Sequence, residues 1–258
     1  MTEFNSEKII AAQDDEYWFP YHYVSRMPSA GFQQHYIDSW GINYISTIDF
    51  MLRQIDKCNP HSLIDIGCGD GRFTREIGIR FPLMNLKGVD YSLRAIALAK
   101  AMNQDMPDLR YEQVDVTKVN FINKYDVAIL MEVFEHIPLD EANEFLAGVR
   151  NTLNEGGILL LTVPHSNKPV EYKHFQHFTI ESIKSFLSPY FEVVEIIPFE
   201  KKGFMRILLN KILCNRLFIL NNSRLLNFLY RFHLQYLFMC SSERECQRIF
   251  VKAIAKKT

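Results

Sequence analysis

From residue 62 onward, short apolar runs alternate with stretches of helical spacing, and this alternation constrains the fold more than any other feature. The apolar runs occupy residues 62–67, 86–90, 111–115, 125–131 and 156–164. The helical stretches between and after them occupy residues 71–81, 92–103, 139–153 and 179–187. Because these runs have no polar face, they predict parallel strands that crossover helices cover on both sides.

Two further apolar runs, 191–199 and 247–255, are predicted as strands, and the segment between them has an unusual charge pattern. Residues 201–240 contain seven Lys or Arg residues and no Asp or Glu, among many large apolar residues. This pattern predicts helices with an apolar and a basic face, which suit peripheral contact with an anionic membrane. A helical hairpin that packs on the domain, or across a homodimer interface, is the other interpretation, and we slightly favour it because the apolar residues are spread around the helices.

Residues 1–60 are predicted to form an N-terminal helical cap, followed by one larger domain at residues 61–258. Aromatic residues are concentrated in this cap, and residues 33–57 carry apolar side chains at helical spacing up to Asn59-Pro60. The cap is expected either to cover a small or amphipathic ligand or to pack on the domain for stability.

Composition limits the partners and the compartment. The net charge is −1, and 48% of the residues are hydrophobic, which is typical of a globular protein with no overall attraction to nucleic acid. The N-terminus does not resemble a secretory signal, and the five cysteines include no C-x-x-C pair. No apolar run reaches the ~18–20 residues that span a bilayer. We therefore expect a cytoplasmic protein, peripheral at most to the inner face of the membrane through residues 200–240.

A glycine-rich turn follows the first predicted strand, running from Asp65 through Gly67, Cys68 and Gly69 to Gly71. Glycines permit positive φ angles and let a ligand approach the backbone closely. Ligands of open α/β sheets bind beyond the carboxyl ends of the strands, where this turn lies. The spacing is G-x-G-x-G, whereas dinucleotide-binding proteins use G-x-G-x-x-G to hold a pyrophosphate. A nicotinamide-dependent oxidoreductase is therefore a distant alternative.

Two carboxylates stand at the ends of the next two predicted strands. Asp90 follows Gly71 by 19 residues, where a carboxylate can accept hydrogen bonds from both hydroxyls of a ribose. Asp115 ends the third strand, where it can accept a hydrogen bond from an adenine amino group. The glycine turn and the two carboxylates, taken in order, favour an adenosine-containing ligand over a purely structural strand–helix turn.

The ordered motifs DIGCGDG, GVDYS, VDVT, DVAILMEVFEHIP and LNEGGILLLTVP resemble those of class I S-adenosylmethionine (SAM)-dependent methyltransferases of types 11, 12 and 23. The resemblance covers residues 60–200 and 247–256. It implies a Rossmann-like, doubly wound α/β fold with a seven-stranded sheet. The last strand is expected to be antiparallel and inserted beside the fifth, with residues 200–246 as a helical insertion before it.

The resemblance also implies SAM as the cofactor and assigns its contacts. The methionine part is expected near the glycine turn, the ribose at the second strand, the adenine at the third, and the methyl group at the fourth. The implied contact residues are Asp65, Gly67, Cys68, Gly69, Asp90, Tyr91, Asp115, Val116, Met131 and Glu132.

Histidine is the expected base for removing a proton from an acceptor hydroxyl. His165 follows the fifth predicted strand and is the first candidate, with His136 and His174 as further candidates. A loop histidine that satisfies backbone groups explains His165 equally well.

Glu132, Glu135 and His136 leave the fourth strand together, and with His174 they offer ligands for a divalent metal. The E-x-x-E-H pattern resembles that of small-RNA 2′-O-methyltransferases and of ubiquinone-pathway O-methyltransferases, where it is associated with a divalent cation. We favour the alternative that the Glu-His pair caps a helix or shapes the pocket without metal.

The expected function is SAM-dependent methylation of a hydroxyl on a small-molecule, sugar or lipid-linked acceptor. The segments EYWFPYHY and HFQHFT resemble methyltransferases of cell-surface polysaccharide and lipid-linked glycan pathways. Nucleic acid is disfavoured as a partner because the chain is nearly neutral and lacks the N/D-P-P-Y/F tetrapeptide. A metal-assisted RNA 2′-O-methyltransferase and a non-catalytic SAM-binding protein stay as alternatives.

Overall fold

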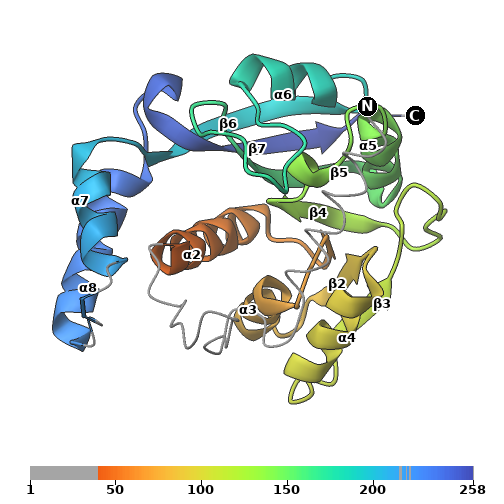
Figure 1. The fold of residues 1–258 in the computed structure, drawn as a ribbon. Helices are drawn as coiled ribbons and strands as arrows, with labels where there is room; N and C mark the ends of the chain where they lie inside the picture. The colour runs from red at the N-terminus through yellow and green to blue at the C-terminus, as the bar shows by residue number, and fades with distance from the viewer. Residues whose placement is uncertain (1–39, 215–216, 219, 221, 258) are drawn as a thin grey trace.

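The computed structural model describes residues 40–214, 217–218, 220 and 222–257. The aromatic residues predicted to form most of the N-terminal cap, up to residue 39, lie outside this range. The described chain folds around a seven-stranded sheet of order β3-β2-β1-β4-β5-β7-β6 (Figure 1). The strands are β1 (Ser62–Ile66), β2 (Asn85–Asp90), β3 (Arg110–Gln113), β4 (Tyr125–Met131), β5 (Leu153–Pro164), β6 (Phe191–Lys201) and β7 (Cys246–Ala255).

Strands β1 to β5 pair in parallel, whereas β7 runs antiparallel between β5 and β6. The register of the last three strands aligns Leu161 of β5 with Val251 of β7, and Val251 with Ile196 of β6. This arrangement confirms the predicted Rossmann-like sheet with an antiparallel last strand beside the fifth. It also places the carboxyl ends of β1, β2 and β4 along one edge, where the predicted ligand residues lie.

Helices cover both faces of the sheet, which explains why the strands carry no polar face. One face packs against α5 (Ala142–Asn151) and α6 (Ile180–Leu187), which contribute Leu146 and Ile183 to the larger core. The other packs against α2 (Trp40–Cys58) and α3 (Arg72–Arg80), which contribute Met51 and Ile77. Helix α4 (Leu93–Met102) packs near the outer strand β3.

Three element boundaries differ from the prediction, each for a local reason. Strand β5 begins at Leu153, before the start predicted at Gly156. Gly156 has a φ of +71° and lies within a register shift against β4, so the pairing continues on both sides of it. The helix expected at 139–153 begins only at Ala142, after a short 3-10 helix, η1 (Phe134–His136). Strand β3 ends at Gln113, which leaves Asp115 in the following loop.

The segment between β6 and β7 contains α7 (Phe204–Leu213), α8 (Ser223–Phe232), the π-helix η2 (His233–Phe238) and the 3-10 helix η3 (Glu243–Glu245). Helices α7 and α8 lie at the end of the molecule, beside α2 and beyond the sheet (Figure 1). Leu209, Leu229 and Leu237 form a small separate core there, against which Ile42 of α2 packs. No helix within the described ranges has the length and apolar character needed to cross a membrane.

Candidate functional site

The glycine turn connects β1 to α3 and is held by hydrogen bonds to the end of β2. Gly67, Gly69 and Gly71 all have positive φ, at 74°, 56° and 76°. The backbone N–H groups of Gly67 and Cys68 both donate to the carbonyl of Val89, at 2.8 and 3.0 Å. A Cβ on Gly67 would lie only 2.6 Å from a methyl carbon of Val133, so this position accepts only glycine without rearrangement.

Asp65 is buried at the end of β1, directly beneath the turn, with 2% of its surface exposed. The hydroxyl of Thr74 in α3 donates to its Oδ2 at 2.6 Å. Burial raises the pKa of Asp65 to about 7, although the Thr74 hydrogen bond opposes this shift. A buried carboxylate of this kind gains a favourable partner when a ligand ammonium is placed beside it.

Asp90 at the end of β2 connects the turn to the next helix. Its Oδ2 accepts from the backbone N–H of Gly69 at 3.0 Å, and its Oδ1 accepts from that of Ser92 at 2.9 Å. Burial raises the pKa of Asp90 in spite of these hydrogen bonds. Each carboxylate oxygen has a second lone pair, so the two hydroxyls of a ribose can still be accepted there. Tyr91 follows directly and is 52% exposed.

Asp115 lies in the loop after β3, and its neighbour Val116 is buried. Its Oδ1 accepts from the backbone N–H and the hydroxyl of Thr117, and Lys118 pairs with its Oδ2 at 2.8 Å. Burial disfavours the charged carboxylate, but the hydrogen bonds from Lys118 and Thr117 outweigh it and lower the pKa of Asp115. The carboxylate is therefore ionised and oriented by its own loop.

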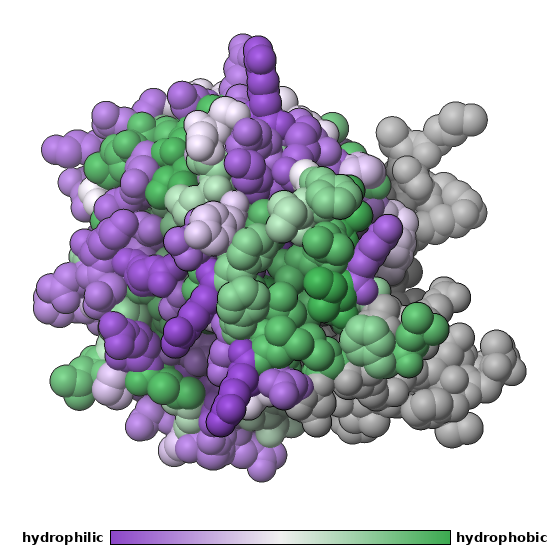
Figure 2. All heavy atoms as spheres, turned by 90° about the vertical axis from the view of Figure 1, so that its left-hand side faces the viewer, coloured by the Kyte–Doolittle hydropathy of each residue, from purple (hydrophilic) through white to green (hydrophobic). Residues whose placement is uncertain are grey.

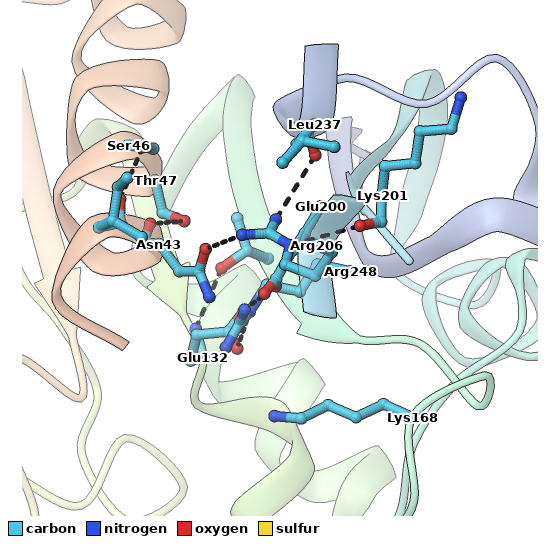
Figure 3. A network of polar contacts seen from close by, with 12 residues as sticks. Asn43, Ser46, Thr47, Glu132, Lys168, Glu200, Lys201, Arg206, Leu237 and Arg248 are labelled. Atoms are coloured by element: carbon cyan, nitrogen blue, oxygen red, sulfur yellow. Dashed lines mark hydrogen bonds and ion pairs between the residues drawn. The ribbon is translucent and has the colours of Figure 1, made fainter. Parts of the chain in front are cut away.

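Glu132 follows Met131, the last residue of β4, and has the left-handed φ of +57°. Its Oε2 accepts from Nε of Arg248 at 2.7 Å, and the same guanidinium also binds Glu200 of β6 (Figure 3). Burial disfavours the charged Arg248, but Glu132 outweighs it and raises the pKa of Arg248. No residue in the described chain bonds the buried Oε1 of Glu132. The predicted contact residue is thus anchored by an arginine that the sequence did not identify.

A second buried arginine connects α7, in the insertion, to α2. The Nη1 of Arg206 in α7 donates to Oδ1 of Asn43 in α2 at 2.6 Å, and its Nη2 donates to the carbonyl of Leu237 at 3.4 Å (Figure 3). Burial lowers the pKa of Arg206 to about 10. Its hydrogen-bonding groups satisfy backbone and amide oxygens, which indicates a structural role.

His165, the first candidate base, is buried at the end of β5, and both of its ring nitrogens are engaged. Its Nδ1 accepts from the backbone N–H of Asn167 at 2.9 Å, which leaves the proton on Nε2. Nε2 then donates to Oε1 of Glu243 in η3 at 2.9 Å. The geometry gives His165 no unengaged nitrogen with which to accept a proton, although its catalytic role stays a prediction to be measured.

A hydrogen bond links His174 to His177, and a separate one holds His136, so the tautomers of all three rings are fixed. Since the carbonyl of Lys168 only accepts, Nδ1 of His177 carries its proton, and its Nε2 accepts from Nδ1 of His174 at 2.8 Å. Nδ1 of His136 donates to the carbonyl of Lys173 at 3.1 Å. The unprotonated nitrogen of both His136 and His174 is therefore Nε2.

Glu135 is fully buried next to these rings. Burial and the neighbouring Glu132 raise the pKa of Glu135 well above its usual range, and its Oε2 has no partner among the described residues. One ligand atom each from Glu135, His136 and His174 lie within 4.8 Å of one another. The structure thus brings together three of the four candidate metal ligands, whereas it pairs the fourth, Glu132, with Arg248.

The burial of His174 also decides between its possible roles as a base and as a metal ligand. Burial, reinforced by the neighbouring His136, lowers the pKa of His174 to about 3. A base with this pKa holds a proton poorly near neutral pH, whereas a neutral imidazole is the form that binds metal. His174 is therefore better suited to be a ligand than a base.

The residues expected to bind SAM fit that cofactor, since they combine two buried carboxylates with a glycine turn that has no room for Cβ at Gly67.

The sequence did not identify Arg248 because its partners Glu132 and Glu200 lie 116 and 48 residues away along the chain. No local pattern signals such a pairing, which depends on β7 running antiparallel beside β6.

Comparison with known proteins agrees with this geometry. Residues 63–157 match the family model described as a methyltransferase domain. The chain is 32% identical over 114 residues to malonyl-[acyl-carrier protein] O-methyltransferase from Halalkalibacterium halodurans, which covers 43% of this chain and 41% of that protein. It is 31% identical over 111 residues to trans-aconitate 2-methyltransferase from Deinococcus radiodurans, with the same coverage of each chain. The chain thus matches about two-fifths of the length of these relatives.

A solved structure shares the fold over a larger part of the chain. The N-methyltransferase NodS from Bradyrhizobium japonicum, in complex with S-adenosyl-L-homocysteine, superposes with a TM-score of 0.56. It covers 86% of this chain and 93% of that chain at 14% identity, which establishes the likeness of fold alone. With its methyltransferase-domain match over residues 63–157, its sheet order and its glycine turn, the chain is similar to the class I SAM-dependent methyltransferases.

Proposed function

We propose that the protein transfers the methyl group of SAM to an oxygen of a small-molecule acceptor. The observation that carries this proposal is the pair of buried carboxylates, Asp65 and Asp90, at the carboxyl ends of adjacent parallel strands. The three left-handed glycines of the turn lie between them. This arrangement offers a negative partner for the SAM ammonium and acceptors for its ribose hydroxyls.

The acceptor class is inferred from the relatives of the methyltransferase domain. The first relative is by name an O-methyltransferase of malonyl-[acyl-carrier protein], and the second acts by name on trans-aconitate, so the names of these relatives give different acceptors. For this chain we propose a hydroxyl of a small-molecule, sugar or lipid-linked acceptor. In such a reaction the acceptor oxygen attacks the methyl carbon, the carbon–sulfur bond breaks, and the hydroxyl proton leaves to a base.

A labelled-methyl transfer screen tests this proposal. The full chain is incubated with methyl-labelled SAM and with glycan, lipid, phenolic and RNA acceptors, and SAM binding is measured in parallel by calorimetry. We expect SAM binding and transfer to at least one non-RNA acceptor, both lost in Asp65→Asn. Asp105→Asn is the matched control, because Asp105 is an exposed carboxylate paired with Arg75.

The outcomes separate the competing functions. Transfer to RNA alone would replace the small-molecule proposal with an RNA 2′-O-methyltransferase. SAM binding with no transfer to any acceptor would favour a non-catalytic SAM-binding protein. Absence of SAM binding by calorimetry would overturn the proposal as a whole.

We further propose that Glu135, His136 and His174 hold a divalent cation. Two imidazoles and one carboxylate form a ligand set that zinc and other transition metals use. The hydrogen bonds to backbone carbonyls and to His177 orient the rings, as groups around metal ligands commonly do. A bound cation would lower the pKa of an acceptor hydroxyl and assist its deprotonation.

Metal content and chelator sensitivity test the cation site. We expect about one equivalent of transition metal per chain by mass spectrometry, together with loss of transferase activity on chelation and recovery on addition of metal. His174→Gln should abolish metal binding, whereas His61→Gln, at an exposed position before β1, should not. Full activity in metal-free protein would contradict the site and leave His136 as the base to be tested.

A further inference from the structure

Helices α7 and α8 present an exposed apolar surface at the end of the molecule (Figure 2). In α7, Phe204 is 76% exposed and Ile207 is 53% exposed, and in α8 Phe228 is 64% exposed. Met205, Leu208 and Leu225 are also exposed. We refer to these six residues as the α7–α8 surface.

The exposed apolar residues are not needed for the internal packing of these helices. Leu209 of α7 and Leu229 of α8 already bury the inner sides of the helices, together with Leu237 and against Ile42 of α2. Arg206 further fixes α7 to α2 through Asn43. The α7–α8 surface therefore lies on a side of the helices that the described part of the chain leaves uncovered, and solvation of large apolar side chains there is unfavourable.

Cations accompany this surface on the same sides of the helices. Helical spacing of four and seven residues aligns Phe204 with Leu208 and Lys211 in α7. The same spacing aligns Arg224 with Phe228 and Arg231 in α8. Lys211, Arg224 and Arg231 are all exposed.

The segment that carries these cations contains no acidic residue of its own to balance them. Residues 201–240 contain no Asp or Glu. The next acidic side chains in sequence are bound elsewhere, Glu243 by His165 and Glu245 by Lys201. In the view of Figure 2, hydrophilic side chains border a continuous apolar patch.

We propose that the α7–α8 surface docks on an anionic lipid membrane. Apolar side chains flanked by cations match the two layers of a membrane interface, in which anionic headgroups lie above acyl chains. A two-fold dimer through the same surface would bring the cations of both copies together, and residues 201–240 supply no acidic partners for them. This repulsion disfavours a second copy of the chain as the occupant of the surface. The helices lie on the membrane and do not cross it. This docking does not depend on the proposed methyl transfer.

Vesicle cosedimentation at low salt tests the proposal with the full chain. We expect binding to phosphatidylcholine vesicles that contain phosphatidylserine, and little binding to phosphatidylcholine alone. One cation near an anionic surface contributes about fivefold in affinity. Changing Lys211, Arg224 and Arg231 together to Ser should therefore weaken vesicle binding on the order of 100-fold. Phe204→Ser combined with Phe228→Ser should weaken vesicle binding by about tenfold or more, because the two rings can no longer be buried among the acyl chains.

Matched controls lie elsewhere on the surface. Leu83 and Ile122 are 99% and 97% exposed, and their change to Ser removes apolar surface of similar size. Arg80, Lys100 and Lys124 are exposed cations whose neutralisation lowers the net charge equally. Both control variants should bind anionic vesicles as the unchanged protein does, and circular dichroism checks the fold of every variant.

Three results would overturn the proposal. The first is absence of binding to anionic vesicles at low salt. The second is an equal loss of vesicle binding in the control variants, which would show that binding does not depend on the α7–α8 surface. The third is self-association of the full chain that Phe204→Ser with Phe228→Ser abolishes, since a second copy would then occupy the surface.

Discussion

The carboxyl group of Asp65 is fully enclosed, and its pKa of about 7 lies within the range of ordinary assay buffers. In an unfolded chain the same group has a pKa near 3.8. Between these values the folded protein retains a proton that the unfolded chain has lost. The free energy of unfolding therefore decreases as pH rises from about 4 to about 7.

Asp65→Asn should remove this dependence. Above pH 7 the variant no longer buries a charge, so we expect it to be more stable than the unchanged protein by up to about 4 kcal/mol. Below pH 4 the two proteins should have similar stability. Denaturant unfolding at pH 5 and pH 8 measures the difference, and equal stability at both pH values would show that Asp65 is solvated in the folded protein.

The same residue should control the pH dependence of SAM binding. The ionised carboxylate attracts the SAM ammonium, so the affinity of the unchanged protein for SAM should rise with pH through about 7. Asp65→Asn should bind SAM weakly at every pH. Calorimetric titrations across this range test the prediction, and an affinity independent of pH would contradict it.

Gly67 allows a comparison of backbone strain with steric conflict. Gly67 and Gly156 have similar φ angles, 74° and 71°, but a Cβ on Gly156 meets nothing within 4 Å. Gly156→Ala should therefore cost only the strain of a left-handed backbone, about 1–2 kcal/mol. Gly67→Ala should cost about 1–3 kcal/mol more because its Cβ meets Val133.

Val133→Ala provides the control for Gly67→Ala. In a chain that already carries Val133→Ala, the additional cost of Gly67→Ala should approach that of Gly156→Ala. Thermal and denaturant unfolding measure all four variants. Equal costs for Gly67→Ala with and without Val133 would show that the turn relaxes without contacting that side chain.

Between elements, His165 and Glu243 connect the end of β5 to η3 and to the start of α6. Oε1 of Glu243 accepts both from Nε2 of His165 and from the backbone N–H of Ile180, at 2.9 and 2.8 Å. One carboxylate therefore holds three segments that are far apart in the chain. This connection fixes the loop that carries His174 and His177 over the edge of the sheet.

His165→Ala should destabilise the fold by about 1–3 kcal/mol, because it leaves buried hydrogen-bonding groups without partners. If the role is structural, turnover per folded molecule and SAM affinity should stay within a few fold of the unchanged protein. A double-mutant cycle with Glu243→Ala measures the coupling between the two side chains. A large loss of turnover at unchanged stability and SAM affinity would instead establish His165 as the catalytic base.

Across the whole molecule, ligand binding and folding are linked through the glycine turn and the carboxyl ends of β1 and β2. A ligand that binds only the folded chain stabilises it by about 2.7 kcal/mol at 100 times its dissociation constant. S-adenosylhomocysteine should therefore raise the melting temperature in a concentration-dependent manner, whereas NAD should not. A rise with NAD alone would favour an oxidoreductase and contradict the proposed cofactor.

The sequence by itself determined the order of elements, and it predicted which residues form the cofactor end of the site. Apolar runs alternating with helical spacing specify a parallel sheet, because period and burial are local properties of the chain. The glycine turn and Asp90 were predicted for the same reason, since the turn lies within seven residues and Asp90 directly ends β2.

Only the tertiary structure decided which groups are engaged and which converge. It showed that both ring nitrogens of His165 are already bonded, that Arg248 holds Glu132, and that His174 approaches His136 and Glu135. These contacts join residues that are dozens to more than a hundred positions apart. Burial, pKa and hydrogen-bond direction depend on the groups packed nearby, and no local pattern in the chain encodes them.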